Sequence, residues 1–149
     1  MSTSNGLFGL ILIGFATTTL AVFKDCGSKE ATVTKVLCNG QDSGPCQLKK
    51  GTDASLEIDF TSKTSQSQLT SVVHGILSGV PVPFSPTDTN ACNGIVEKCP
   101  IAPNNNYSFK TSLPVKSIYP SLRLVVRWEI QDPSSTDVIC IELPAEIVS

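Results

Sequence analysis

The sequence has few of the residues and motifs on which most enzymes and nucleic-acid-binding proteins depend. It has one histidine among 149 residues, and no Gly-x-Ser-x-Gly, His-Glu-x-x-His or Cys-x-x-Cys motif. Hydrolases and metalloproteases rely on such motifs or on a second histidine. Eleven basic and thirteen acidic residues give a net charge of −2 with no long run of one sign, which argues against a nucleic-acid partner. We therefore expect a binding protein, not an enzyme, with neither cofactor nor metal.

Charge is also missing from residues 1–21. The apolar run Leu7–Ala16 is followed by small residues, and Thr19-Leu20-Ala21 fits a cleavage site. The run is shorter than the ~20 residues that a membrane span needs, so we interpret this segment as a signal peptide. A membrane anchor is the alternative, because no Lys or Arg precedes the run. Cleavage would leave one domain, residues 22–149.

All six cysteines follow this segment, and an even number in an exported chain predicts three disulfides. Sequence alone leaves the pairing open, although proximity suggests Cys38 with Cys46 and Cys92 with Cys99, leaving Cys26 to pair with Cys140. Metal binding is the alternative. It is disfavoured because the only histidine, His74, lies far from the cysteines in the sequence.

No segment shows a sustained helical period, whereas apolar and polar residues alternate in several short runs. The clearest is Leu122–Ile130, in which every second residue from Leu122 is apolar. Further strands are predicted at 56–60, 138–143, 69–77, 32–37 and 107–111. About seven short strands separated by turn residues indicate an all-β fold, an immunoglobulin-like antiparallel β-sandwich.

Two proline-punctuated apolar segments break this pattern. The region from Thr64 to Thr87 contains no charged residue and ends in Gly79–Pro86, where three prolines favour a sheet edge or a loop. A second such segment, Leu113–Pro120, precedes the clearest strand. If both meet at one edge of the sandwich, Phe84 and Tyr119 would be rings at the mouth of an apolar cavity. The alternative is that both rings close the end of a packed core.

Motifs along the whole mature chain occur in the order of one known family: Phe23-Lys24-Asp25-Cys26-Gly27-Ser28, Cys46-Gln47-Leu48, Val72-Val73-His74-Gly75-Ile76-Leu77, Gly79-Val80-Pro81-Val82-Pro83-Phe84, Cys99-Pro100-Ile101, Leu113-Pro114-Val115-Lys116-Ser117, Tyr119-Pro120-Ser121 and Leu124-Val125-Val126. They resemble the Niemann-Pick type C2 sterol-transfer proteins, also known as the epididymal secretory protein type. The resemblance implies the ML lipid-recognition domain, a sandwich whose sheets enclose one sterol. It also implies the disulfides Cys26–Cys140, Cys38–Cys46 and Cys92–Cys99.

The same resemblance suggests which residues contact the ligand. The family's gating and pocket residues match Phe84, Val115 and Tyr119 letter for letter, and further lining positions match Val82, Pro120 and Trp128. The chain departs from vertebrate members in a longer loop between Cys38 and Cys46. It also has Ile141 where a Trp commonly follows the last cysteine, which would leave room for other ligands.

The implied function is that of a monomeric sterol carrier, secreted or in the lysosomal lumen. It would contact anionic membranes transiently and pass its sterol to a multipass lysosomal membrane protein. Lys116 and His74 are the candidate contacts with such partners. Asn106-Tyr107-Ser108 is a glycosylation sequon at Asn106. The alternatives are an extracellular carrier of fatty acids or semiochemicals and an innate-immune lipid-recognition module.

Overall fold

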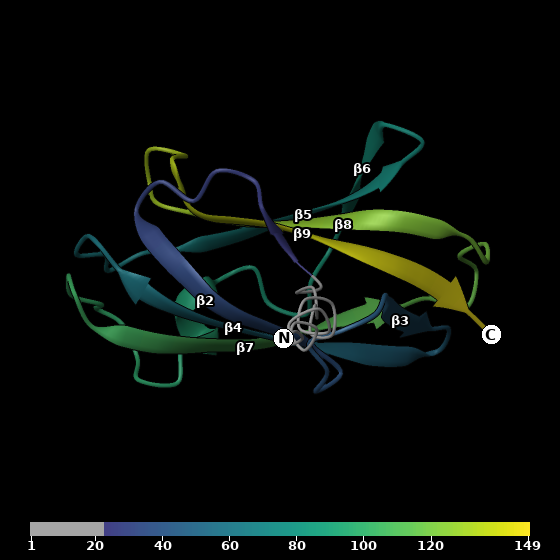
Figure 1. The fold of residues 1–149 in the computed structure, drawn as a ribbon, viewed down its shortest axis with the longest axis horizontal. Coiled ribbons are helices and arrows are strands. Elements are labelled where there is room, and N and C mark those ends of the chain that lie inside the picture. The colour runs from purple at the N-terminus through teal and green to yellow at the C-terminus, as the bar shows by residue number, and fades with distance from the viewer. Residues whose placement is uncertain (1–22) are drawn as a thin grey trace, which may run out of the picture.

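Two β-sheets packed face to face make up the protein (Figure 1). The structure, a computed structural model, describes residues 23–149, so the predicted signal peptide at residues 1–21 lies outside the described residues. Its strands are β1 (Lys24–Asp25), β2 (Ala31–Cys38), β3 (Cys46–Lys49), β4 (Thr52–Ser62), β5 (Thr70–Leu77), β6 (Val80–Phe84), β7 (Asn106–Val115), β8 (Arg123–Gln131) and β9 (Asp137–Val148), with a 3₁₀ turn, η2 (Ala91–Gly94). Within this part of the chain, no helix is long and apolar enough to cross a membrane.

The larger sheet has six strands in the order β1-β9-β8-β5-β6, with β3 added beside β9, and the smaller sheet has the order β2-β4-β7. The predicted sandwich and the strands expected from alternation are confirmed. One ladder departs from the antiparallel rule, because β3 pairs with β9 in parallel. Strands β1 and β3 were not predicted, because they have two and four residues and are too short for a pattern of alternation.

The two proline-punctuated segments adopt different secondary structures. Val80–Phe84 forms β6, a strand at the outer edge of the larger sheet, which agrees with the expected sheet edge. Leu113–Pro120 is divided between a strand and a loop: Leu113–Val115 completes β7, and the remaining residues lie between β7 and β8. Pro114 is tolerated there because β7 is also an edge strand, so its missing N–H leaves no ladder bond unmade.

The core lies between the sheets and is formed by every second residue of the long strands. Trp128 on β8 and its cross-strand neighbour Ile141 on β9 are both almost completely buried. The indole Nε1 of Trp128 donates a hydrogen bond of 3.3 Å to the Oγ of Ser71, which is also buried. This bond satisfies two polar groups inside an apolar core and holds the indole in one orientation.

All three predicted disulfides are present: Cys26–Cys140, Cys38–Cys46 and Cys92–Cys99. The first connects the segment after β1 with β9, within one sheet. The second joins β2 of the smaller sheet to β3 of the larger sheet, and the third closes the loop that contains η2. Only Cys38–Cys46 therefore links a strand of one sheet to a strand of the other.

Candidate ligand-binding cavity

A small apolar cavity of about 20 Å³ lies between the sheets. The larger sheet contributes side chains from β3, β8 and β9, and the smaller sheet contributes side chains from β4 and β7. The cavity is lined by Cys46, Leu48, Ala54, Ser55, Leu56, Leu113, Val126, Trp128 and Leu143. A void of this size is about one probe sphere in volume, so in this conformation the two sheets are close-packed.

Among the residues predicted to bind ligand, Trp128 lines this cavity. Its ring centroid lies 6.2 Å from that of Phe109, at an interplanar angle of 60°. Together with the hydrogen bond to Ser71, this contact fixes one wall of the cavity. Ile141, the position singled out as lacking a large ring, lies directly beside Trp128 in the sheet.

The structure brings Phe84 and Tyr119 together, although neither lines the cavity. Their ring centroids are 5.4 Å apart and the planes are tilted by 33°. Phe84 is on the edge strand β6, and Tyr119 is in the loop that connects β7 of the smaller sheet to β8 of the larger sheet. Both side chains are half-buried. The pair therefore forms a partly exposed contact at the edge of the sandwich.

The other predicted contacts are more scattered. Val115 is buried at the end of β7 but does not line the cavity, and Val82 and Pro120 are exposed. The Phe84–Tyr119 contact is nevertheless connected to the cavity through neighbouring residues of the larger sheet. Gly75, on β5, lies against the Phe84 ring and is the cross-strand partner of Val126, a lining residue. The aromatic contact and the cavity are therefore adjacent on the inner face of the larger sheet.

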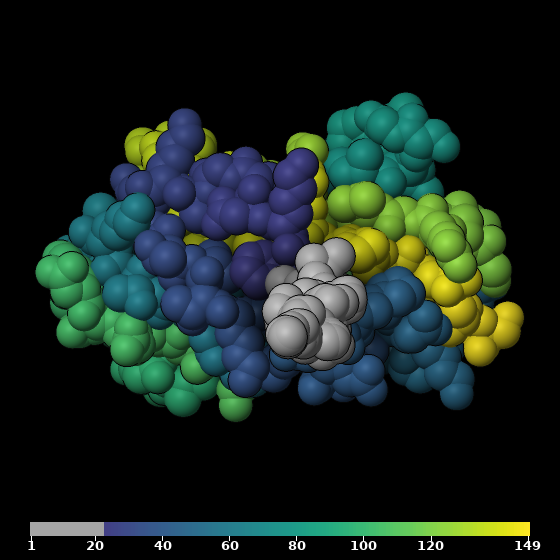
Figure 2. Space-filling view, in the orientation of Figure 1, coloured from purple at the N-terminus to yellow at the C-terminus, as the bar shows by residue number. Residues whose placement is uncertain are grey.

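The two long edges of the sandwich are built differently. At one edge, the disulfide Cys38–Cys46 ties the sheets together, and Cys46 itself borders the cavity. At the other edge, β6 is the last strand of its sheet, and among residues 23–149 it pairs only with β5. Figure 2 shows the teal β5–β6 hairpin projecting from the body of the molecule. We call the first the tied edge and the second, with the Phe84–Tyr119 contact, the open edge.

The open edge carries exposed apolar side chains. Val80 and Val82 on β6 are 60% and 37% exposed, and Ile118 in the β7–β8 loop is 83% exposed. Lys116 in the same loop is exposed as well. Exposed large apolar side chains on the two elements that the Phe84–Tyr119 contact joins make this edge a candidate site of interaction.

His74 is half-buried on β5, between the buried residues Val73 and Gly75, and therefore faces outward. Ser71 is buried on the inner face, where it accepts the hydrogen bond of the indole, so His74 and Ser71 lie on opposite faces of the sheet. Asn106 is exposed at the start of β7, and its Oδ1 accepts a hydrogen bond of 2.6 Å from Thr61 Oγ1.

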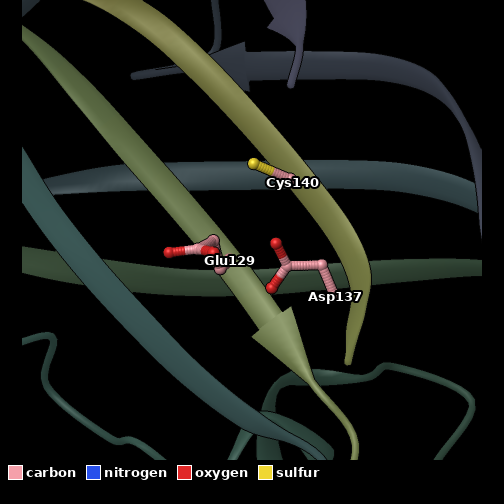
Figure 3. A group of neighbouring side chains, drawn as sticks. All are labelled: Glu129, Asp137 and Cys140. Atoms are coloured by element: carbon pink, nitrogen blue, oxygen red, sulfur yellow. The ribbon is translucent and has the colours of Figure 1, made fainter. Parts of the chain in front are cut away.

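A pair of carboxyl groups on the outer face of the larger sheet was not predicted. Glu129 on β8 and Asp137 on β9 approach each other beside Cys140 (Figure 3). Partial burial and the neighbouring Asp137 raise the pKa of Glu129 to about 7, and Arg127 opposes this shift. Cys140 is in a disulfide and offers no thiolate to a metal ion. Only the pairing of the strands reveals this cluster, because sequence alone does not place the two carboxyl groups together.

A disulfide-bonded β-sandwich with an apolar cavity between its sheets has the architecture of a binding protein. Residues 21–147 match the model of the ML domain family. The chain is 40% identical to NPC intracellular cholesterol transporter 2 of Danio rerio (96% of this chain, 97% of the relative) and 42% identical to that of Mus musculus (85% of each). A crystal structure of a Niemann-Pick type C2 protein from the Japanese carpenter ant matches with a TM-score of 0.76 at 25% identity, covering 85% of this chain and 99% of the other. The chain belongs to the ML-domain family and, within it, to the Niemann-Pick type C2 proteins.

Proposed function

We propose that the protein is a lipid carrier, not an enzyme, that binds one sterol between its sheets and transfers it to membranes or to a membrane-protein acceptor. The observation that carries the proposal is the apolar cavity between the sheets, in a chain 40% identical to a relative named as a cholesterol transporter. A second support is that Phe84 of the Phe84–Tyr119 pair lies against Gly75, whose cross-strand partner Val126 lines the cavity. This arrangement supports a mouth and an interior pocket on the same face of one sheet.

Binding would be driven by burial of apolar surface. At roughly 25 cal/mol per Å², a lipid that buries a few hundred Å² gains on the order of 10 kcal/mol before the costs of association. A pocket for such a ligand has a volume of roughly 300 to 1,000 Å³. The cavity of about 20 Å³ must therefore expand. The open edge can separate most easily, because no disulfide ties β6 to the smaller sheet.

In this proposal the open edge is also the entrance. Phe84 and Tyr119 gate it, Val82 and Pro120 line its outer part, and Val115 and Trp128 line the interior. The hydroxyl of the lipid stays near the mouth, so no polar group is dragged through the core. The chain acts as a monomer.

Transfer would use the surface around this entrance. Lys116 and the outward-facing His74 would contact anionic headgroups or a multipass lysosomal membrane protein. We further propose that residues 1–21 are removed as a signal peptide, that residues 22–149 form the mature ML domain, and that Asn106 carries a glycan. The mature protein is then secreted or delivered to the lysosomal lumen.

One observation favours a second candidate, a carrier of fatty acids or semiochemicals. Ile141 is completely buried directly beside Trp128 in the sheet. A smaller side chain beside the cavity wall leaves more room and relaxes the fit to one rigid ligand.

The two candidates are separated by titrating delipidated protein with a fluorescent sterol, using a long-chain fatty acid as competitor. Two buried alanines of the smaller sheet provide matched variants. Ala54 lines the cavity, whereas Ala31 is equally buried but does not. Ala54→Met and Ala31→Met should each lose about 1 to 3 kcal/mol of stability through overpacking. Only Ala54→Met should lose sterol binding, because it alone fills the cavity.

Tight sterol binding that fatty acid fails to displace, and that Ala54→Met removes, supports the sterol carrier. Weak sterol binding with efficient displacement by fatty acid supports the second candidate. If Ala54→Met and Ala31→Met both bind sterol as the wild type does, the cavity between the sheets is not the binding site and the proposal is wrong.

A further inference from the structure

Gly75 occupies an unusual position for a glycine. It lies in the interior of β5, on the buried inner face, and its φ is not in the left-handed region, so its backbone conformation does not require glycine. A glycine within a strand weakens that strand and often marks the close approach of another group. Here the approaching group is the ring of Phe84.

The space above Gly75 is filled by two side chains. A Cβ atom at this position would lie 2.9 Å from Cε1 and 3.2 Å from Cζ of Phe84, and 3.0 Å from Cδ1 of Leu124. The shortest of these contacts requires something to move, and what would move is the ring of Phe84 and not the backbone. The missing side chain of Gly75 therefore leaves a space, which we call the seat, and Cε1 and Cζ of the Phe84 ring lie against it.

This seat lies between the entrance and the cavity. Gly75 pairs across the sheet with Val82 on β6 and with Val126 on β8. Val126 lines the cavity, and Phe84 also contacts Tyr119 at the open edge. A methyl group on Gly75 would point from the inner face into the gap between the sheets, and it would push the Phe84 ring in the same direction. The entrance would become narrower.

We propose that Gly75 is a specificity-determining residue, which sets the width of the entrance by setting the depth of the Phe84 ring. The inference rests on the proposed function. A narrower entrance excludes a broad, rigid ring system more strongly than a thin, flexible acyl chain. Gly75 thus favours sterol because it keeps the entrance wide enough for the ring system, and no contact between Gly75 and the ligand is required.

The test is a double-mutant cycle of Gly75→Ala in the wild-type and Phe84→Ala backgrounds. Fluorescent sterol and long-chain fatty acid are titrated in all four proteins. We expect Gly75→Ala to weaken sterol binding about tenfold with Phe84 present, the scale set by forcing a ring off its rotamer. Fatty-acid binding should change little, and the loss should disappear when Phe84 is Ala. The change in chain entropy caused by Gly→Ala is common to both backgrounds and cancels.

The free energy of unfolding of the four lipid-free proteins is also measured in urea, which gives a second double-mutant cycle that needs no ligand. Energetic coupling between positions 75 and 84, together with the selective loss of sterol, supports the proposal. An equal loss of sterol in both backgrounds, an equal loss of sterol and fatty acid, or no coupling in unfolding overturns it. If the wild type binds neither lipid, the proposed function fails and the specificity role fails with it. The unfolding cycle then still reports whether Gly75 seats Phe84.

Discussion

Two Phe–Tyr pairs with almost the same geometry lie at opposite ends of the sandwich. Phe60 and Tyr107 have centroids 5.8 Å apart and an angle of 32°, while Phe84 and Tyr119 are 5.4 Å apart at 33°. The first pair is buried, with exposed fractions of 2% and 8%, and the second is half-exposed. The two ring contacts therefore have nearly the same geometry, and the pairs differ in how far their surroundings bury them.

The surroundings explain what each pair can do. Phe60 and Tyr107 face each other across the β4–β7 ladder of one sheet, and the Tyr107 hydroxyl accepts a hydrogen bond of 2.8 Å from the backbone of Ala102. Phe84 and Tyr119 instead join an edge strand to a loop. A buried pair held across the ladder of one sheet stabilises the fold. A pair held at one edge can separate at low cost, as a gate must.

The largest contrast is expected from matched truncations of the two phenylalanines. Phe60→Ala should lose about 3 to 5 kcal/mol of stability, because it leaves a cavity in packed core. Phe84→Ala should lose only about 1 kcal/mol, since its ring is already partly exposed, but it should weaken lipid binding. Urea unfolding and lipid titration measure the two effects separately.

A large loss of stability in Phe84→Ala, with lipid binding intact, would show that this ring closes the end of a packed core. In that case Phe84 and Tyr119 would be core residues, and the proposal that they gate the entrance would be wrong.

The role of the tied edge can be tested by comparing its disulfide with another disulfide of similar loop length that does not join the sheets. Cys38–Cys46 and Cys92–Cys99 are separated by 8 and 7 residues, so replacing either pair by serine should cost a similar amount, about 2.5 kcal/mol. Only Cys38–Cys46 joins the two sheets and borders the cavity. We therefore expect faster lipid release from the Cys38→Ser/Cys46→Ser protein alone, measured as the dissociation rate of a bound fluorescent lipid. Equal release rates in the two variants would contradict the role of the tied edge.

The smallest effect is expected on the outer face, away from both aromatic pairs. The pKa of Glu129 is about 7 in the folded protein, above its ordinary value of 4.5. The stability gained by holding this proton is therefore fully present below about pH 4.5 and is lost as the pH rises through about 7. Glu129→Gln should be the more stable protein near neutral pH, and its advantage should vanish in acid.

Unfolding curves across this pH range test the effect, with Glu146→Gln on the neighbouring strand β9 as the control. Lipid binding should not change in either variant, because both side chains lie on the outer face. If Glu129→Gln keeps the pH dependence of the wild type, the Glu129–Asp137 pair does not cause it.

Much of the fold could be predicted because its information is local. Alternation in Leu122–Ile130 and in the shorter runs reports which face of a strand is buried, and proline restricts Val80–Phe84 to an edge. The nearest cysteines in sequence paired as proximity suggested. Strand β3 was missed because four residues carry too little pattern. The sequence could not place Pro114 in a strand, because a proline in an edge strand and a proline in a loop look alike in sequence.

The site was predictable only in part, for a different reason. Motifs pointed to Phe84, Tyr119 and Trp128, yet the wall formed by Leu48, Leu113 and their neighbours comes from strands that are distant in sequence.

The all-β class, the three disulfides and the apolar edge can be inferred from the sequence, because periodicity, cysteine number and proline stereochemistry act within short segments. Tertiary structure alone decided which edge is tied, which Phe–Tyr pair is buried and why Gly75 has no side chain. These properties depend on contacts between strands far apart in the chain, and such contacts exist only after the two sheets have packed against each other.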